Sequence, residues 1–132
     1  MTIVIDTSVI ISIITNEAHK NQLIKLTKGE EVLAPESLYF EIGNAFSAMF
    51  KRSRISFKQA KKAIEYYNEI PLRLVEVDME KSLEIADKYK IYAYDAYFIE
   101  CSKRYKSEIM SLDKELVEIA KKEGIKVREV EG

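Results

Sequence analysis

Four acidic residues occupy positions where their neighbours are apolar, and their side chains are the ones best suited to chemistry. Asp6 closes the apolar run of residues 3–5, and Asp113 closes a second run at residues 109–112. Glu41 and Asp95 each interrupt the apolar stripe of a predicted helix, and no Lys or Arg shares these stripes. An inward carboxylate is costly unless a cation meets it. A hard metal ion with oxygen ligands, Mg²⁺ or Mn²⁺, would meet that need and support hydrolysis.

Each acid also has an ordinary explanation. Asp6 and Asp113 stand between a predicted strand and a predicted helix, where Asp often caps the helix. Asp95 could cap the helix that it opens, and Glu41 could be a surface residue, because helices tolerate Glu readily. One shared cause explains the four positions better than four coincidences. We therefore expect one or two divalent ions bound by Asp6, Glu41, Asp95 and Asp113.

Composition narrows the alternatives. The chain has 132 residues, 47% of them apolar, and a net charge of −1, which leaves the kind of partner open. Cys101 is the only cysteine and His19 the only histidine. A disulfide framework, a cysteine or histidine metal cluster, and nucleophilic catalysis by Ser/His/Asp are therefore disfavoured.

Short apolar runs alternate with helical periodicity, which predicts an α/β fold. We expect a single domain over residues 1–132, a three-layer α/β/α sandwich around a central parallel sheet of about five strands. The strands are expected at residues 2–5, 31–34, 72–77, 109–112 and 125–130, and the helices at residues 7–14, 19–28, 36–51, 57–68, 79–90, 94–105 and 114–122. Such sheets place their sites at the carboxyl ends of the strands, where Asp6 and Asp113 fall.

A basic segment follows Glu41. No acid occurs between Glu41 and Glu65, and that interval holds Lys51, Arg52, Arg54, Lys58, Lys61 and Lys62. Such a cluster can follow a phosphate backbone, although basic clusters are also common on solvated surfaces.

Three tyrosines add a second nucleic-acid signal. Tyr92, Tyr94 and Tyr97 lie close together in the chain. They could stack on unpaired bases, although such side chains more often belong to the core or to an interface.

The start of the chain goes directly into a predicted strand, without a basic leader and long apolar core. No run approaches the roughly 20 apolar residues that span a bilayer. We expect a cytoplasmic protein with no membrane association.

In order and spacing, four segments resemble the motifs of PIN-domain nucleases. They are residues 3–8 with Asp6 and Ser8, residues 35–45 with Glu41, residues 92–97 with Asp95, and residues 111–113. In length the chain is similar to the VapC-type toxins of toxin–antitoxin pairs. The resemblance implies that the four acids form the family's metal site and that Ser8 orders a ligand. A further acidic ligand found in many members has no clear counterpart, since Lys114 and Glu115 follow Asp113.

The resemblance implies a metal-dependent endoribonuclease that hydrolyses RNA by metal-activated water. It also implies a VapB-type antitoxin as partner and a homodimer. Lys51, Arg52, Arg54 and Lys58 would contact the RNA. Two alternatives stay open: a non-catalytic PIN-like module that binds RNA or protein, and an RNA-processing or DNA-directed nuclease of the same fold.

Overall fold

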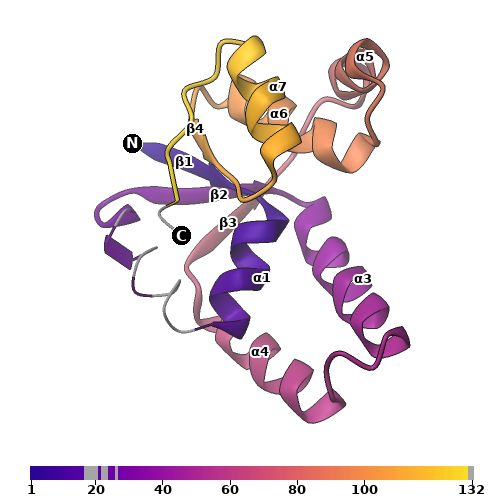
Figure 1. The fold of residues 1–132 in the computed structure, drawn as a ribbon. Coiled ribbons are helices and arrows are strands. Elements are labelled where there is room, and N and C mark those ends of the chain that lie inside the picture. Colours follow the sequence, from indigo (N-terminus) through magenta and orange to yellow (C-terminus); the bar gives the residue numbers. More distant parts are fainter. Residues whose placement is uncertain (17–20, 22–23, 26, 131–132) are drawn as a thin grey trace.

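A four-stranded parallel sheet lies at the centre of the computed structural model, which describes residues 1–16, 21, 24–25 and 27–130 (Figure 1). The strands run in the order β3-β2-β1-β4, so β1 is an inner strand. Their bounds are β1 Thr2–Ile5, β2 Glu31–Pro35, β3 Leu72–Val75 and β4 Glu108–Met110. The predicted α/β class and parallel sheet are confirmed.

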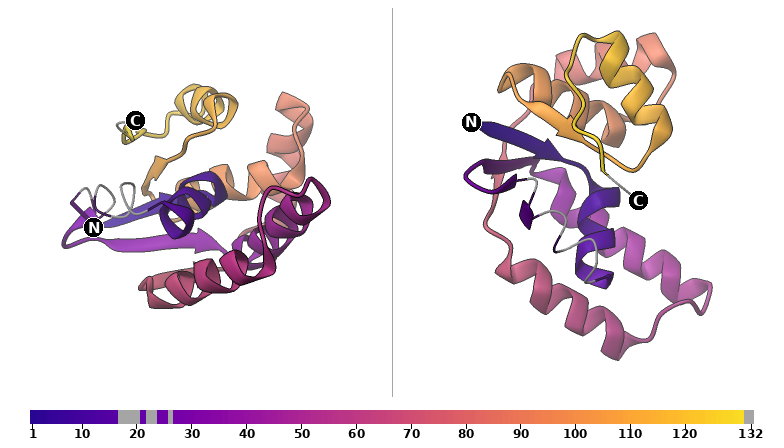
Figure 2. Two further views of the ribbon diagram at one scale, coloured as in Figure 1. Left: turned by 60° about the horizontal axis from the view of Figure 1, so that its bottom comes forward. Right: turned by 60° about the vertical axis from the view of Figure 1, so that its left-hand side comes forward.

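Helices cover both faces of the sheet. They are α1 (Thr7–Thr15), α3 (Ser37–Lys51), α4 (Phe57–Glu69), α5 (Met79–Tyr89), α6 (Ala93–Arg104) and α7 (Lys114–Lys122). Right-handed crossovers place α1, α3 and α4 on one face and α5, α6 and α7 on the other. The packing agrees, because α1 contacts α3 and α4, whereas α6 contacts β1, β2, α5 and α7 (Figure 2).

The core follows from this layering. Ile3, Val4 and Ile5 of β1 are fully buried, because an inner strand of a parallel sheet is covered on both faces. Ser56 caps α4 and completes a capping box with Gln59. No helix among the described residues has both the length and the apolar character needed to cross a membrane.

Several predicted elements differ. The expected fifth strand at residues 125–130 is reduced to one bridge between Ile109 and Val127. The third strand ends at Val75 rather than at residue 77. Pro35 belongs to β2, which is one residue longer than predicted. Five of the ten residues 19–28, where a helix was expected, lie outside the described residues.

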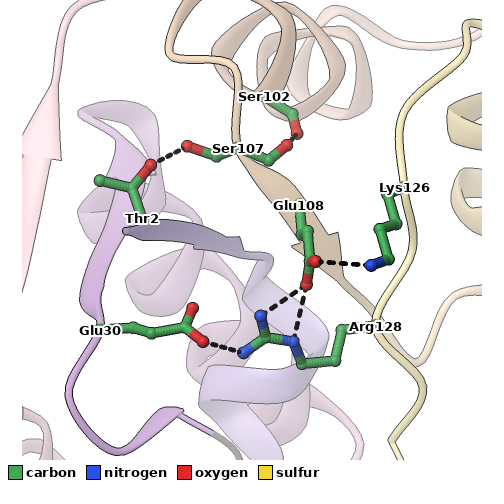
Figure 3. Close-up of polar contacts among 7 residues, drawn as sticks. All are labelled: Thr2, Glu30, Ser102, Ser107, Glu108, Lys126 and Arg128. Carbon is green, nitrogen blue, oxygen red and sulfur yellow. Dashed lines mark hydrogen bonds and ion pairs between the residues drawn. The ribbon is translucent and has the colours of Figure 1, made fainter.

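Ion pairs hold the segment that was expected to be the fifth strand (Figure 3). Arg128 binds Glu108 of β4 at 2.6 Å and Glu30, just before β2, at 2.8 Å. Lys126 lies 3.3 Å from the other oxygen of Glu108. Thr2 and Ser107 share a hydrogen bond in the same region. Side chains thus supplement the two backbone bonds that the segment makes with Ile109.

Candidate active site

The topology brings the end of β1 next to the end of β4. The chain leaves β1 for α1 on one face and leaves β4 for α7 on the opposite face, which opens a crevice at the carboxyl ends of these strands. The Asp6 amide donates to the Met110 carbonyl at 3.2 Å, so Asp6 and Ser111 follow neighbouring strand ends.

Asp6 is buried and serves as the N-cap of α1. Its carboxylate accepts hydrogen bonds from the Ser8 hydroxyl at 2.7 Å, the Val9 amide at 3.2 Å and the Ser111 hydroxyl at 2.5 Å. Burial nevertheless raises the pKa of Asp6 to about 6, against the three hydrogen bonds, and the nearby charge of Asp113 adds to the rise.

Glu41 projects from α3 toward the same place. The Ser37 hydroxyl, one turn earlier, donates to it at 3.2 Å. Burial raises the pKa of Glu41 to about 7, and the charges of Asp95 and Asp6 raise it further, whereas Thr7 and Ser37 lower it. The Thr7 hydroxyl is buried without a well-aligned hydrogen bond, although it is close enough to Glu41 to favour the ionised carboxylate.

Asp95 and Asp113 complete the acidic group. Asp95 is half-buried in the first turn of α6. Burial raises its pKa, and the charges of Asp113 and Glu115 act in the same direction. Asp113 is exposed and caps α7, accepting from the Glu115 and Leu116 amides at 2.9 and 3.3 Å. Each of the four predicted acids therefore lies within electrostatic reach of two of the others.

Hydroxyl groups link these acids to the strand ends. Ser8 donates to Asp6 and accepts from the Leu112 amide at 3.0 Å, which ties α1 to the β4–α7 connection. Ser111 bridges Asp6 and the Asp113 amide, which donates to it at 2.9 Å. Ser111, Ser37 and Thr7 were not among the predicted site residues. The available signal was that Thr7 directly follows Asp6 and that Ser37 lies one turn before Glu41, whereas Ser111 lay inside the strand predicted at residues 109–112.

The donor chemistry of the acidic group suits a divalent ion. Among the causes of the raised pKa values of Asp6, Glu41 and Asp95, no basic side chain occurs. The described residues contain no group of three or more His, Cys, Asp or Glu side chains already close enough to ligate one ion. Mg²⁺ commonly keeps several waters and takes only one or two protein carboxylates, so this donor set suits it.

The basic segment lies apart from the acids. Lys51, Arg52, Arg54 and Lys58 are exposed around the connection between α3 and α4. Figure 1 places this connection at the end of both helices that is farther from the sheet. Glu41 and Lys51 are ten residues apart on α3, which corresponds to about 15 Å along the helix.

Comparisons with known proteins agree with this architecture. Residues 3–122 match the PIN domain family. A structure of PAE2754 from Pyrobaculum aerophilum is similar with a TM-score of 0.70 and 19% identity, covering 98% of this chain and 92% of that chain. VapBC2 from Rickettsia felis, solved with a DNA fragment from its promoter, is similar with a TM-score of 0.65 and 11% identity, covering 98% of both chains.

A third structure, a domain of a functionally unknown protein from Methanocaldococcus jannaschii, has a TM-score of 0.59 and 18% identity and covers 99% of this chain and 91% of that chain. These low identities support the shared fold alone. A comparison with curated proteins gives no significant match.

Proposed function

Because the chain belongs to the PIN domain family, we propose that it is a metal-dependent endoribonuclease, the toxin of a toxin–antitoxin pair that acts in the cytoplasm. Proteins of this family are commonly nucleases. The substrate, the metal and the toxin role are the parts proposed for this chain.

One observation carries the proposal. Two carboxylates, Asp6 and Glu41, are held in surroundings that raise their pKa values to about 6 and about 7. Asp95 and Asp113 add further negative charge, and no basic side chain is among the causes that shift the pKa values of Glu41 and Asp95. Such a group destabilises the fold unless a positive charge binds there, as strained groups at functional sites often do.

Each side chain of the site has its own role in the proposed reaction. Asp6 and Glu41 would be the inner ligands, and Asp95 and Asp113 would act directly or through water. When bound, Mg²⁺ or Mn²⁺ would lower the pKa of a water and neutralise the phosphate. Ser8 and Ser111 keep the Asp6 carboxylate oriented through their hydrogen bonds. Lys51, Arg52, Arg54 and Lys58 would hold the phosphate backbone farther along the strand.

Two protein partners are part of the proposal, an antitoxin and a second copy of the chain. The VapBC2 relative was solved as a complex, as its name states. In this chain, Tyr39 and Phe40 at the start of α3 are 56% and 72% exposed beside a cavity of about 540 Å³. Exposed aromatic surface of this kind favours protein contacts.

The decisive experiment incubates purified protein with pooled cellular RNA, with Mn²⁺ or with chelator, and maps the ends of the products. We expect internal cuts that need the metal and leave 5′-phosphate and 3′-hydroxyl ends, because water is the nucleophile. Cyclic 2′,3′-phosphates would contradict the mechanism. Cleavage of DNA rather than RNA would identify a DNA-directed nuclease, and absence of both cleavage and metal binding would identify a binding module.

A further inference from the structure

A second cavity, of about 360 Å³, lies beside the acidic group at the carboxyl ends of β2 and β3. Its lining consists of Glu36, Ser37, Val75, Glu76, Val77, Met79 and Tyr97. From this lining we propose that the cavity binds one unpaired guanine base of the substrate, next to the phosphate that is cut. This inference rests on the proposed nuclease function and deepens it by assigning a source of base preference.

Ser37 connects the cavity with the acidic group. The Ser37 side chain lines the cavity and also donates its hydroxyl to Glu41 at 3.2 Å. A nucleotide whose phosphate approaches Glu41 therefore has its base within reach of the cavity. The volume falls within the range of about 300–1,000 Å³ that small-molecule sites have.

The walls suit a flat ring. Val75 and Val77 supply apolar surface, and Met79 is a polarizable side chain that adapts to its neighbours. Tyr97 provides an aromatic face, and its hydroxyl contacts the Met79 sulfur at 3.6 Å, which restrains both side chains. Tyr94 packs edge-on against Tyr97, with ring centroids 6.0 Å apart, and supports it from the side. Stacking on an aromatic ring is a common way to bind unpaired bases.

The polar groups select the kind of base. Glu36 and Glu76 line the cavity, and neither forms an ion pair within the described part of the chain. Two carboxylates repel a phosphate, so the cavity is unsuited to the backbone. Ionised carboxylates only accept hydrogen bonds. Guanine is the base whose Watson–Crick edge offers a ring N–H and an amino group side by side, and these two donors match the two oxygens of one carboxylate.

Binding provides a test that does not depend on cleavage. Fluorescein-labelled pentanucleotides of uridine, with or without one central guanosine, would be titrated by fluorescence anisotropy in the presence of chelator. We expect the guanosine to tighten binding by about tenfold, the gain typical of a good bidentate base contact. Glu36→Gln combined with Glu76→Gln should abolish the gain, as should Tyr97→Leu. Tyr97→Phe keeps the ring and should retain most of it.

Tyr92→Leu is the matched control, because Tyr92 is a tyrosine at the start of the same helix, is 84% exposed and does not line the cavity. Equal affinity for the two pentanucleotides, or a guanosine gain that survives the double Glu variant and Tyr97→Leu, would overturn the inference. Competition by arginine amide without any guanosine gain would assign the cavity to a peptide side chain, which also overturns it.

Cleavage mapping on RNA of random sequence separates this inference from the proposed function. If wild type cuts next to guanine and the cavity variants cut at comparable rates without that preference, both stand. If cutting depends on metal but ignores guanine, the nuclease proposal stands and the base pocket is wrong. If nothing is cut, the nuclease proposal fails, and the anisotropy result alone decides whether the cavity binds guanine.

Discussion

The Asp6 carboxylate accepts three hydrogen bonds, and burial still raises its pKa to about 6. Hydrogen bonds favour the ionised form and burial opposes it, so the balance shows that burial is the larger effect here. Asp6 is also the N-cap of α1. A helix cap and a metal ligand are therefore compatible roles, because the second oxygen faces the β4 end through Ser111.

The first prediction tests the two acids on opposite sides of the crevice. Asp6→Asn and Asp95→Asn keep the shape and remove a charge, so each should lower the cleavage rate by ~10²-fold or more. Rates at limiting Mn²⁺ would be measured against Asp87→Asn, which changes an exposed aspartate on α5 that pairs with Lys90. Full activity in both site variants would refute the site assignment.

The second prediction concerns stability without metal. A carboxyl group whose pKa is higher in the folded than in the unfolded protein destabilises the fold when it ionises. The free energy of unfolding therefore falls as pH rises from about 4, the ordinary pKa of the group, through its folded pKa. For Asp6 and Glu41, with folded pKa values of about 6 and about 7, the loss should be complete near pH 8. Glu41→Gln should then be as stable as wild type at pH 4 and more stable, by ~1–3 kcal/mol, at pH 8.

Urea unfolding in chelator would measure this, with Glu65→Gln, an exposed glutamate on α4, as control. Mn²⁺ should raise the melting temperature of wild type and raise it much less in Glu41→Gln, because the ion binds only the folded site. A wild-type melting temperature indifferent to Mn²⁺ would count against the metal site.

At the scale of elements, α3 and α4 form a hairpin that separates the basic segment from the acidic group. The acids lie at the sheet end of α3 and the cations at the other end, about 15 Å away. A strand bound at both places must extend over several nucleotides.

The third prediction follows from that hairpin. Replacing Lys51, Arg52 and Arg54 with Gln should weaken RNA binding for all sequences and flatten the dependence of affinity on salt, since fewer counterions are released. Lys121→Gln with Lys122→Gln, at the end of α7, should change the slope less per charge removed. An unchanged slope in the hairpin variant would place these cations outside the RNA contact.

Glu123, the C-cap residue of α7, joins three helices. Its side chain is 7% exposed and pairs with Lys88 at 2.9 Å and Lys103 at 2.8 Å, and Tyr89 donates to it as well. Hydrogen bonds from Lys103, Tyr89 and Lys88 lower the pKa of Glu123 to about 2.

The fourth prediction uses this carboxylate. Because its folded pKa is depressed, its stabilisation is present above the ordinary value of 4.5 and disappears as pH falls toward 2. Glu123→Gln should cost ~1–2 kcal/mol at pH 6, since both lysines are substantially exposed, and little at pH 2.5. Chemical denaturation at both pH values would show it, and a cost that does not change with pH would contradict the ion-pair explanation.

Elements with a strong local pattern were predictable, and those set by distant partners were not. Periodicity and caps gave α4, α7 and the sheet class correctly, because the signals lie within one helix turn or one strand. The prediction of a strand at residues 125–130 was wrong. The alternating apolar side chains are also compatible with a single bridge, and the ion pairs of Arg128 hold the segment. The proximity of the four acids was inferred from the sequence. The role of Ser111 was not, because it depends on a hydrogen bond to Asp6, which lies 105 residues earlier in the chain.

For the whole molecule, Arg128 connects the end of the described chain to its first half. It is 18% exposed and holds Glu108 and Glu30, which are 16% and 19% exposed (Figure 3). The Arg128 guanidinium thus pairs with both carboxylates, and Glu108 has Lys126 as a further partner.

The fifth prediction is that Arg128→Met destabilises the entire fold by ~2–4 kcal/mol, because it removes the ion-pair partner of the largely buried Glu30 and leaves Glu108 with Lys126 as its remaining partner among the described residues. Lys126→Met, which removes an 81% exposed partner of Glu108, should cost under ~1 kcal/mol. A single unfolding transition that shifts as a unit is expected if residues 1–132 form one domain. Loss of a separate, early transition would instead show that the segment unfolds by itself.

The strand order also has a consequence for the nascent chain during synthesis. β1 is made first, but its neighbour β4 begins only at Glu108, and Ser111 completes the hydrogen bonds of Asp6. During synthesis at about 5–20 residues per second, β1 must wait several seconds with one edge unpaired. The acidic group of the proposed nuclease would therefore stay incomplete during synthesis until the segment with Ser111 and Asp113 has emerged, because Ser111 holds the carboxylate of Asp6.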